Sequence, residues 1–190
     1  MNNAAFPILD EINRLKADID TFHPLDPEME QRVMDRFRLE WNYHSNAIEG
    51  NTLSLGETKA FLLEGITAQG KPFKDYLDIE GHDAAIDYLL DFLRNEGPLT
   101  EVDIRRLHEI LLVKSYDITA KKPDGRMTRL LTNLHLMKHG YPPIIIQKED
   151  RGAYYLALAE ADEGNPENIV NLIGSRLASS MELYLRGAHR

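Results

Sequence analysis

The sequence predicts an all-α fold. Apolar residues recur every three to four positions along most of the chain, which places them on one face of a helix. Residues that start and stop helices separate these periodic stretches, and no pair of alternating, strand-like segments interrupts them. A chain of 190 residues is long enough for one domain that buries roughly 70% of its unfolded surface. We therefore expect a single helical domain over 1–190, with an N-terminal region, 1–56, and a core, 57–190.

Two amphipathic helices are predicted before residue 50. The first follows Pro7, because proline is favoured in the first turn of a helix. Its apolar positions are Ile8, Ile12, Leu15 and Ile19. Asp26 and Pro27 then provide a cap and a first helical position for a second helix that runs toward Trp41. Gly50 is a plausible end for this helix.

Three further helices are expected between residues 54 and 112. Ser54 and Glu57 have the spacing of a capping box, which opens a short helix that stops near Gly65. A longer helix follows, and its apolar positions are Ile79, Ile86, Leu89 and Leu93. Thr100 and Asp103 repeat the capping pattern and begin the next helix, whose apolar positions are Ile104, Leu107 and Leu111.

Three more helices are predicted in the last third of the chain. One begins near Arg126 and ends at Gly140, with apolar positions Met127, Leu130, Leu131, Leu134 and Met137. The segment 144–146 that follows is short and extended. A helix over about 150–162 and another from Asn165-Pro166 to about residue 185 complete the set, the second with a proline at its first position.

Composition and charge exclude several classes of protein. The formal net charge is −9 and no basic run is present, which argues against a nucleic-acid partner because phosphate neutralisation by Lys and Arg supplies most of that affinity. No apolar run approaches the ~18 residues of a membrane span, and the first residues do not resemble a signal peptide. The absence of cysteine excludes a disulfide framework and a thiolate metal site. We expect a cytoplasmic protein that has no membrane partner.

Two short segments carry the most specific signal. Ser45-Asn46-Ala47-Ile48-Glu49-Gly50 matches the pattern Ser/Thr-x-x-x-Glu-Gly/Asn. Asp124-Gly125-Arg126-Met127-Thr128-Arg129 places two arginines three positions apart at the start of an apolar helix, so both can face one bound phosphate group. Together, and in this order, the segments resemble the inhibitory segment and the end of the catalytic motif of Fic (Fido) family proteins.

The resemblance implies a Fic-like helical domain with an N-terminal inhibitory helix. Family members of this kind are AMP transferases that use ATP and Mg²⁺ to modify a hydroxyl side chain of a target protein, and frequently form homodimers. By resemblance, Gly125, Arg126 and Arg129 bind the nucleotide, and Asp124 binds Mg²⁺.

The same resemblance assigns an inhibitory role to Ser45, Glu49 and Gly50. Glu49 is expected to pair with Arg129 and to occupy the space that the γ-phosphate would need. The guanidinium of arginine suits both anions, because it forms two parallel hydrogen bonds with a carboxylate or a phosphate.

The sequence departs from the family's catalytic motif, His-Pro-Phe-x-Asp/Glu-Gly-Asn-Gly-Arg-x-x-Arg. Lys121-Lys122-Pro123 stands directly before Asp124, so the His-Pro-Phe and Gly-Asn parts are absent, as is most of the family's β-flap. The histidine is the base that takes the proton of the target hydroxyl. We therefore expect no AMP transfer by this chain, and a break or an abrupt link in the chain within residues 120–126.

Alternatives stay open for the function. The chain is alternatively a non-catalytic helical module that binds a nucleotide or a partner protein. Glu49 is alternatively a surface glutamate at a helix end, and Arg126 with Arg129 a solvated face. Tyr154 and Tyr155 are typical of helix-core aromatics, with the nucleotide pocket as the alternative.

Two further patterns favour structural roles. The segment 65–72 nearly matches a phosphate-binding loop, but Pro72 replaces its hydroxyl residue and no strand precedes it, so we predict a plain loop. His135 and His139 are four positions apart on a helix, as in zinc proteases, but neither the glutamate nor a third ligand accompanies them.

Overall fold

The computed structural model describes residues 6–21, 27–94, 97–112 and 125–188, and all elements within these ranges are helical, as predicted. The elements are α1 (Ile8–Asp20), α2 (Pro27–Ile48), α3 (Leu55–Glu64), α4 (Phe73–Leu93), α5 (Glu101–Leu112), α6 (Gly125–Lys138), the 3-10 turn η2 (Lys148–Asp150), α7 (Arg151–Asp162) and α8 (Glu167–Ala188). The predicted link within 120–126 lies almost entirely outside the described residues.

Local chemistry accounts for the helix ends. The capping box at the start of α3 is confirmed: the Ser54 hydroxyl accepts from the Glu57 N–H, and the Glu57 carboxylate accepts from the Ser54 N–H. Gly65 ends α3 in the left-handed conformation, with φ 69°. Thr100 and Asp103 form the same reciprocal pair ahead of α5.

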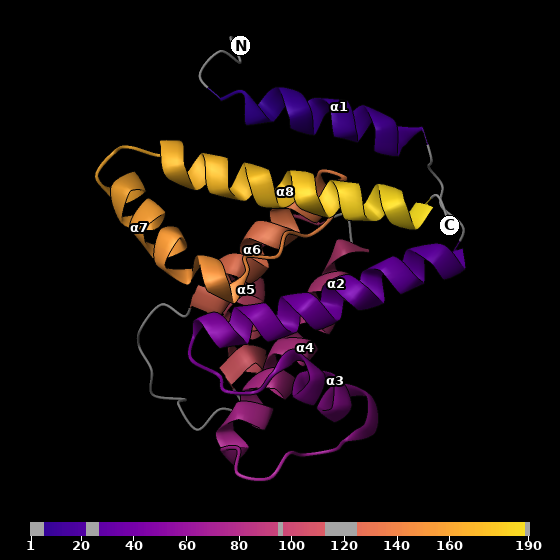
Figure 1. Ribbon diagram of the computed structural model, residues 1–190, viewed down its shortest axis with the longest axis vertical. Coiled ribbons are helices and arrows are strands. Elements are labelled where there is room, and N and C mark those ends of the chain that lie inside the picture. Colours follow the sequence, from indigo (N-terminus) through magenta and orange to yellow (C-terminus); the bar gives the residue numbers. More distant parts are fainter. Residues whose placement is uncertain (1–5, 22–26, 95–96, 113–124, 189–190) are drawn as a thin grey trace.

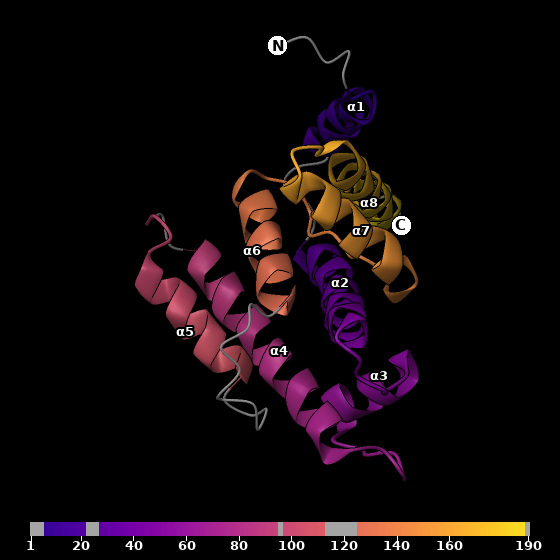
Figure 2. The same cartoon turned by 90° about the vertical axis from the view of Figure 1, so that its left-hand side faces the viewer.

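The long helix α2 connects the two halves of the molecule. In Figure 1, α1 and α8 lie side by side at one end, and α3 and α4 form the other end, with α2 between them. Figure 2 shows α6 between the α4–α5 pair and the group formed by α2, α7 and α8. Because α2 packs against α3, α4, α6 and α8, its last turns lie where elements from both halves meet.

The main hydrophobic core runs through the junction of these helices. Its fully buried side chains include Phe37, Ile48, Ile86, Leu130 and Met181. A second, smaller cluster near α3 consists of Leu53, Tyr76 and Ile79. No helix in the described ranges is long and apolar enough to cross a membrane.

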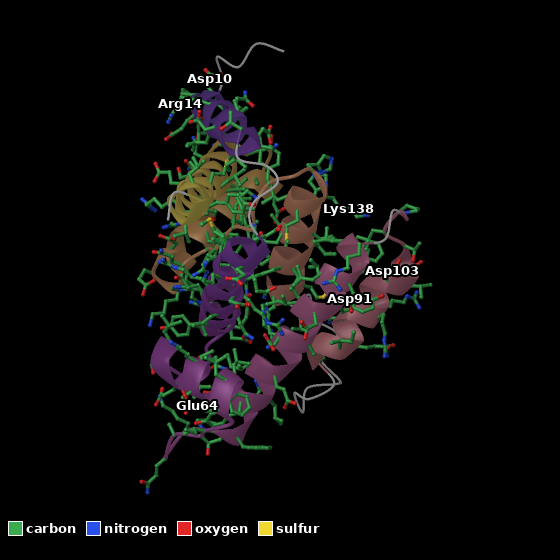
Figure 3. All side chains as sticks on the ribbon, turned by 90° about the vertical axis from the view of Figure 1, so that its right-hand side faces the viewer. Asp10, Arg14, Glu64, Asp91, Asp103 and Lys138 are labelled. Carbon is green, nitrogen blue, oxygen red and sulfur yellow. The ribbon has the colours of Figure 1, made fainter. Side chains whose placement is uncertain are left out.

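Most charged side chains lie at the surface, which makes the buried ones informative. Figure 3 shows charged side chains around the outside of the bundle, for example at the labelled positions Asp10, Glu64 and Asp91. Among the described residues, the Asp, Glu, Lys and Arg side chains that are buried are Asp75, Asp78, Arg126 and Arg129. Burial of charge is costly unless the group is paired, so the partners of these residues mark the candidate site.

Candidate functional site

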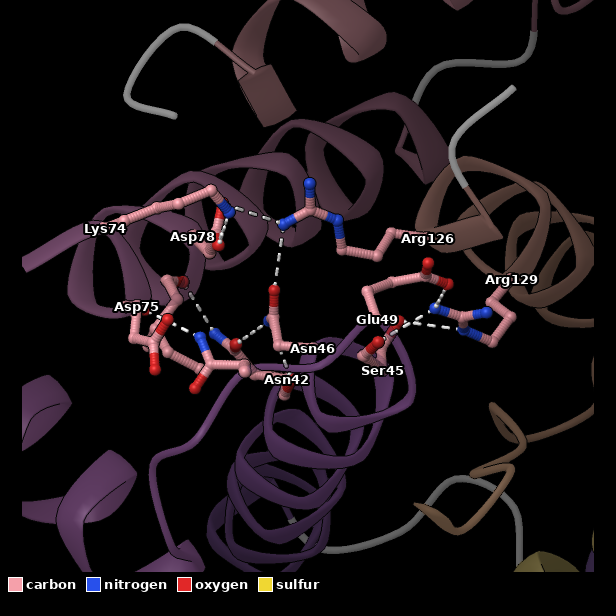
Figure 4. Close-up of polar contacts among 11 residues, drawn as sticks. Asn42, Ser45, Asn46, Glu49, Lys74, Asp75, Asp78, Arg126 and Arg129 are labelled. Atoms are coloured by element: carbon pink, nitrogen blue, oxygen red, sulfur yellow. Dashed lines mark hydrogen bonds and ion pairs between the residues drawn. The ribbon is translucent and has the colours of Figure 1, made fainter. Parts of the chain in front are cut away.

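The two segments that carry the sequence signal meet where the end of α2 faces the start of α6 (Figure 4). Arg129 Nη2 lies 2.9 Å from Glu49 Oε1 and donates to the Ser45 carbonyl oxygen at 2.8 Å. Arg129 Nε donates to the Ser45 hydroxyl at 3.0 Å. The predicted contact between Glu49 and Arg129 is confirmed, and Arg129 is only 5% exposed, so its interpretation as part of a solvated face was wrong.

Glycine at position 125 allows the carboxylate to approach α6. A Cβ at Gly125 would lie 2.5 Å from Glu49 Oε1 and 2.9 Å from Arg129 Nη1, closer than side-chain carbons approach such atoms. Steric crowding by Glu49 and Arg129 therefore explains why position 125 is glycine, and the sequence pattern alone did not predict this crowding. Gly50 has φ 97°, a left-handed conformation that glycine adopts without strain, and it turns the chain directly after Glu49.

The start of α7 adds two contacts that the sequence did not predict. Arg151 Nε donates to the carbonyl oxygen of Ile48, the last residue of α2, at 2.8 Å. The Tyr155 hydroxyl donates to Glu49 Oε1 at 3.2 Å, and the Arg151 guanidinium lies 5.2 Å from the centre of the Tyr155 ring. Burial and the Glu49 carboxylate raise the pKa of Tyr155, so the hydroxyl keeps the proton that it donates.

The two tyrosines divide between core and surface. Tyr154 is buried, as predicted, and it lies beside the Arg129 guanidinium. Tyr155 is 38% exposed, so its interpretation as a core residue was wrong. The spacing of Arg151 and Tyr155 on one helix face was the only sequence signal for their joint position.

Arg126 turns away from Arg129 toward α4. Its Nη1 donates to Asn46 Oδ1 at 3.0 Å and lies 3.2 Å from Asp78 Oδ1. Figure 4 shows the two guanidinium groups with separate sets of partners. In this structure the arginines therefore do not face a common point, contrary to the expectation from their spacing, and Arg126 is buried rather than solvated.

A cavity of about 90 Å³ adjoins Arg129. Its lining is mainly apolar, with the side chains of Trp41, Ser45, Thr132 and Tyr154 among the contributors. Arg129 Nη1 and Trp41 Nε1 are buried and donate no hydrogen bond to a protein atom in the described ranges. Because a buried donor without an acceptor is costly, a ligand with acceptor oxygens suits the surroundings of Arg129.

The remaining candidates lie elsewhere. Asp124 is outside the described residues, and no group of three or more His, Asp or Glu side chains in the described ranges could hold a metal ion. The segment 65–72 is a plain loop, as predicted, in which Lys71 donates to the Thr52 carbonyl oxygen. His135 and His139 are exposed near the end of α6, in accord with a structural role.

Curated proteins with similar sequences share one description. No protein-family model matches the chain. The protein adenylyltransferase Fic of Culex quinquefasciatus is 25% identical over 236 aligned positions, which cover 93% of this chain and 47% of that protein. Protein adenylyltransferase fic-1 of Caenorhabditis elegans is 26% identical, with 82% of this chain and 42% of that protein covered. Protein adenylyltransferase Fic of Aedes aegypti is 28% identical, with 75% and 41% covered.

The alignments also show how this chain differs from those relatives. It spans about half the length of the curated relatives that it matches. Because 93% of 190 residues is about 177, about 59 of the 236 aligned positions in the Culex comparison have no counterpart in this chain.

Solved structures agree with the sequence matches. A Fic domain containing signaling protein from Bacteroides thetaiotaomicron superposes with a TM-score of 0.87 at 25% identity, covering 94% of this chain and 97% of that one. Fic-1 from C. elegans superposes with a TM-score of 0.84 at 23% identity, which shows the shared fold, and covers 95% of this chain and 71% of that one. In its helical fold, in its sequence and in the segments that meet at Glu49 and Arg129, this chain is similar to Fic proteins.

Proposed function

We propose that this chain is a Fic-family domain related to protein adenylyltransferases, which binds the phosphates of ATP at Arg129 and Arg126, is held in an inhibited state by Glu49, and does not transfer AMP by itself. The observation that carries the proposal is the Glu49–Arg129 contact of 2.9 Å within a buried arginine environment. The names of the relatives support the choice of nucleotide and of a target protein, and the Glu49–Arg129 contact supports the proposed inhibition.

Glu49 and a phosphate group compete for the same arginine. The guanidinium of Arg129 already binds Ser45 and Glu49, and its buried Nη1 has no protein acceptor in the described ranges. A phosphate placed on this arginine gains charge-assisted hydrogen bonds, but it also meets the Glu49 carboxylate. Two anions cannot share this small volume without repulsion, so Glu49 has to leave before phosphate binds.

The absence of AMP transfer follows from the missing motif residues. General acid–base catalysis by a positioned side chain contributes about 10²–10⁴-fold, and the family's histidine has no counterpart before Gly125. The described residues also form no metal site, so we assign no step to Mg²⁺, and Asp124 as its ligand stays a prediction.

The test combines binding and activity. We expect isothermal titration with ATP to show at least about tenfold higher affinity for Glu49→Gly than for the unaltered chain, because a competing anion has been removed. Glu64→Gly, which removes an exposed glutamate at the end of α3, is the matched control and should leave the affinity unchanged. Incubation with labelled ATP, Mg²⁺ and a cell lysate should label no protein in either case.

Two results would overturn the proposal. Labelled protein bands with the unaltered chain or with Glu49→Gly would show that another residue supplies the base. An ATP affinity that is the same for Glu49→Gly and Glu64→Gly would show that Glu49 does not guard the nucleotide site.

A second candidate function is protein interaction. Three exposed apolar side chains follow one another along the chain: Leu63 in α3, Ile66 in the loop after it and Phe73 at the start of α4, with exposed fractions of 71%, 53% and 67%. Such side chains on neighbouring segments are typical of protein interfaces. Light scattering of the purified chain would show whether this surface forms the expected homodimer, and replacement of Phe73 by Glu should then give monomers.

A further inference from the structure

A second buried ion pair lies outside the Glu49–Arg129 contact. Arg126 and Asp78 connect α6 with α4, with 3.2 Å between Nη1 and Oδ1, and their side chains are 8% and 6% exposed. Asp78 Oδ1 accepts no hydrogen bond from the residues that the structure describes, and among them the Arg126 guanidinium charge compensates it. The other oxygen, Oδ2, lies 2.7 Å from Lys74 Nζ, which is 55% exposed.

Helix α2 also holds Arg126, through a chain of buried amides. Asn42 Nδ2 donates to the Ile79 carbonyl oxygen of α4, and Asn46 Nδ2 donates to Asn42 Oδ1 and to the Asn42 carbonyl oxygen. These bonds orient the Asn46 amide, so that its Oδ1 faces Arg126 and accepts from Nη1 at 3.0 Å. Asn42 and Asn46 are almost completely buried, which makes this orientation costly to change.

We propose that Asp78 and Asn46 position Arg126 and form a second lock on the phosphate site, separate from Glu49. The inference rests on the proposed role of the arginine pair in phosphate binding. Asn46 and Asp78 hold the guanidinium against α4, and the Asp78 carboxylate cancels much of its charge in a place that solvent screens poorly. Removal of Glu49 therefore frees Arg129 alone, and Arg126 joins a phosphate chain only when Asp78 is neutralised or displaced.

A merely structural ion pair would behave differently. If Asp78 only joined α4 to α6, its neutral replacement would lower the stability of the fold and leave anion affinity at the level of a control. If Asp78 withholds Arg126 from phosphate, the same replacement raises the affinity for a polyanion. The two roles thus predict different anion affinities for the neutral replacement: no change for a structural pair and a gain for the proposed lock. This difference does not depend on the change in stability.

Titration with inorganic tripolyphosphate measures this directly, because it contains the phosphate chain without the nucleoside. We expect Asp78→Asn to raise the affinity at least about fivefold, both alone and on top of Glu49→Gly. Asp83→Asn is the matched control: Asp83 is on the same helix and is paired with Arg38 at 2.6 Å, so its neutralisation changes the net charge equally. Asp78→Glu, which keeps the carboxylate, should bind like the unaltered chain.

The outcomes separate the inference from the proposed function. An affinity of Glu49→Gly no higher than that of the unaltered chain overturns both. A gain with Glu49→Gly, together with Asp78→Asn values equal to those of Asp83→Asn, overturns the second lock alone. If Asp78→Asn does not fold by circular dichroism, Asp78→Ser removes the same charge and leaves space for water beside Arg126, and the same fivefold gain decides the matter.

Discussion

Replacement of Glu49 by glutamine tests how firmly the end of α2 is held. Glutamine keeps the size of the side chain and an amide oxygen, but it removes the charge that faces Arg129 at 2.9 Å. Arg129 keeps its two hydrogen bonds to Ser45 and loses its only carboxylate among the described contacts. We expect Glu49→Gln to lower the free energy of unfolding.

The magnitude follows from the exposure of the two side chains. Exposed ion pairs contribute about 0–1 kcal/mol, whereas breaking a buried pair costs about 3–5 kcal/mol. The side chain of Arg129 is 5% exposed and that of Glu49 is 29% exposed, so the pair lies between these limits. Glu49 also follows the C-terminal end of α2, where a negative charge is unfavourable by about 0.3–1 kcal/mol, and glutamine removes that cost. The net loss should be about 1–2 kcal/mol.

Urea denaturation at low ionic strength is the assay, with Glu64→Gln as control. Glu64 is exposed at the end of α3, so its neutralisation should change stability by no more than about 0.5 kcal/mol. For a domain of this size, the expected loss with Glu49→Gln corresponds to a melting temperature about 2–8 °C lower. Equal stability of Glu49→Gln and Glu64→Gln would refute the reasoning, because Arg129 would then not depend on the carboxylate.

Three more predictions follow from close contacts and from one histidine. Gly125→Ala should displace the Glu49 carboxylate, which lies 2.5 Å from the new Cβ, and cost about 1 kcal/mol. A double-mutant cycle in urea should show a smaller loss in the Glu49→Gly background, where only the contact of 2.9 Å with Arg129 Nη1 remains. Gly81→Ala places its Cβ 2.7 Å from a backbone carbonyl oxygen of α5. Because that backbone cannot move away easily, the substitution should lower the free energy of unfolding by about 1–3 kcal/mol. Gly152→Ala on α7 is the control: its Cβ meets open space, so the free energy of unfolding should not fall. His44 Nδ1 accepts the backbone N–H of the first residue of η2, and burial lowers the pKa of this histidine below 6.5, so folding disfavours its protonated form. Stability should therefore be complete above about pH 6.5 and fall as the pH is lowered from there, with a smaller fall in thermal melts of His44→Gln.

The periodic spacing of apolar residues was enough to predict the helices, because each helix buries one face. This pattern can be recognised without knowing which helix packs against that face. Capping depends on residues three positions apart, so the starts of α3 and α5 could be predicted from Ser54 and Thr100. The contact between Glu49 and Arg129 was also predicted, although only through the resemblance to a family, since the two residues are 80 positions apart.

The sequence by itself thus determined the helical class, most helix ends and the pair of segments that form the site. Only the tertiary structure decided that Arg126 turns to Asp78 and Asn46, that Tyr155 and Arg151 hold the end of α2, and that a side chain at position 125 would collide with Glu49. The physical reason is that these contacts join different helices. The angle and position at which two helices cross determine which side chains meet. That crossing results from packing over the whole core, so it cannot be predicted from the spacing of residues within one helix.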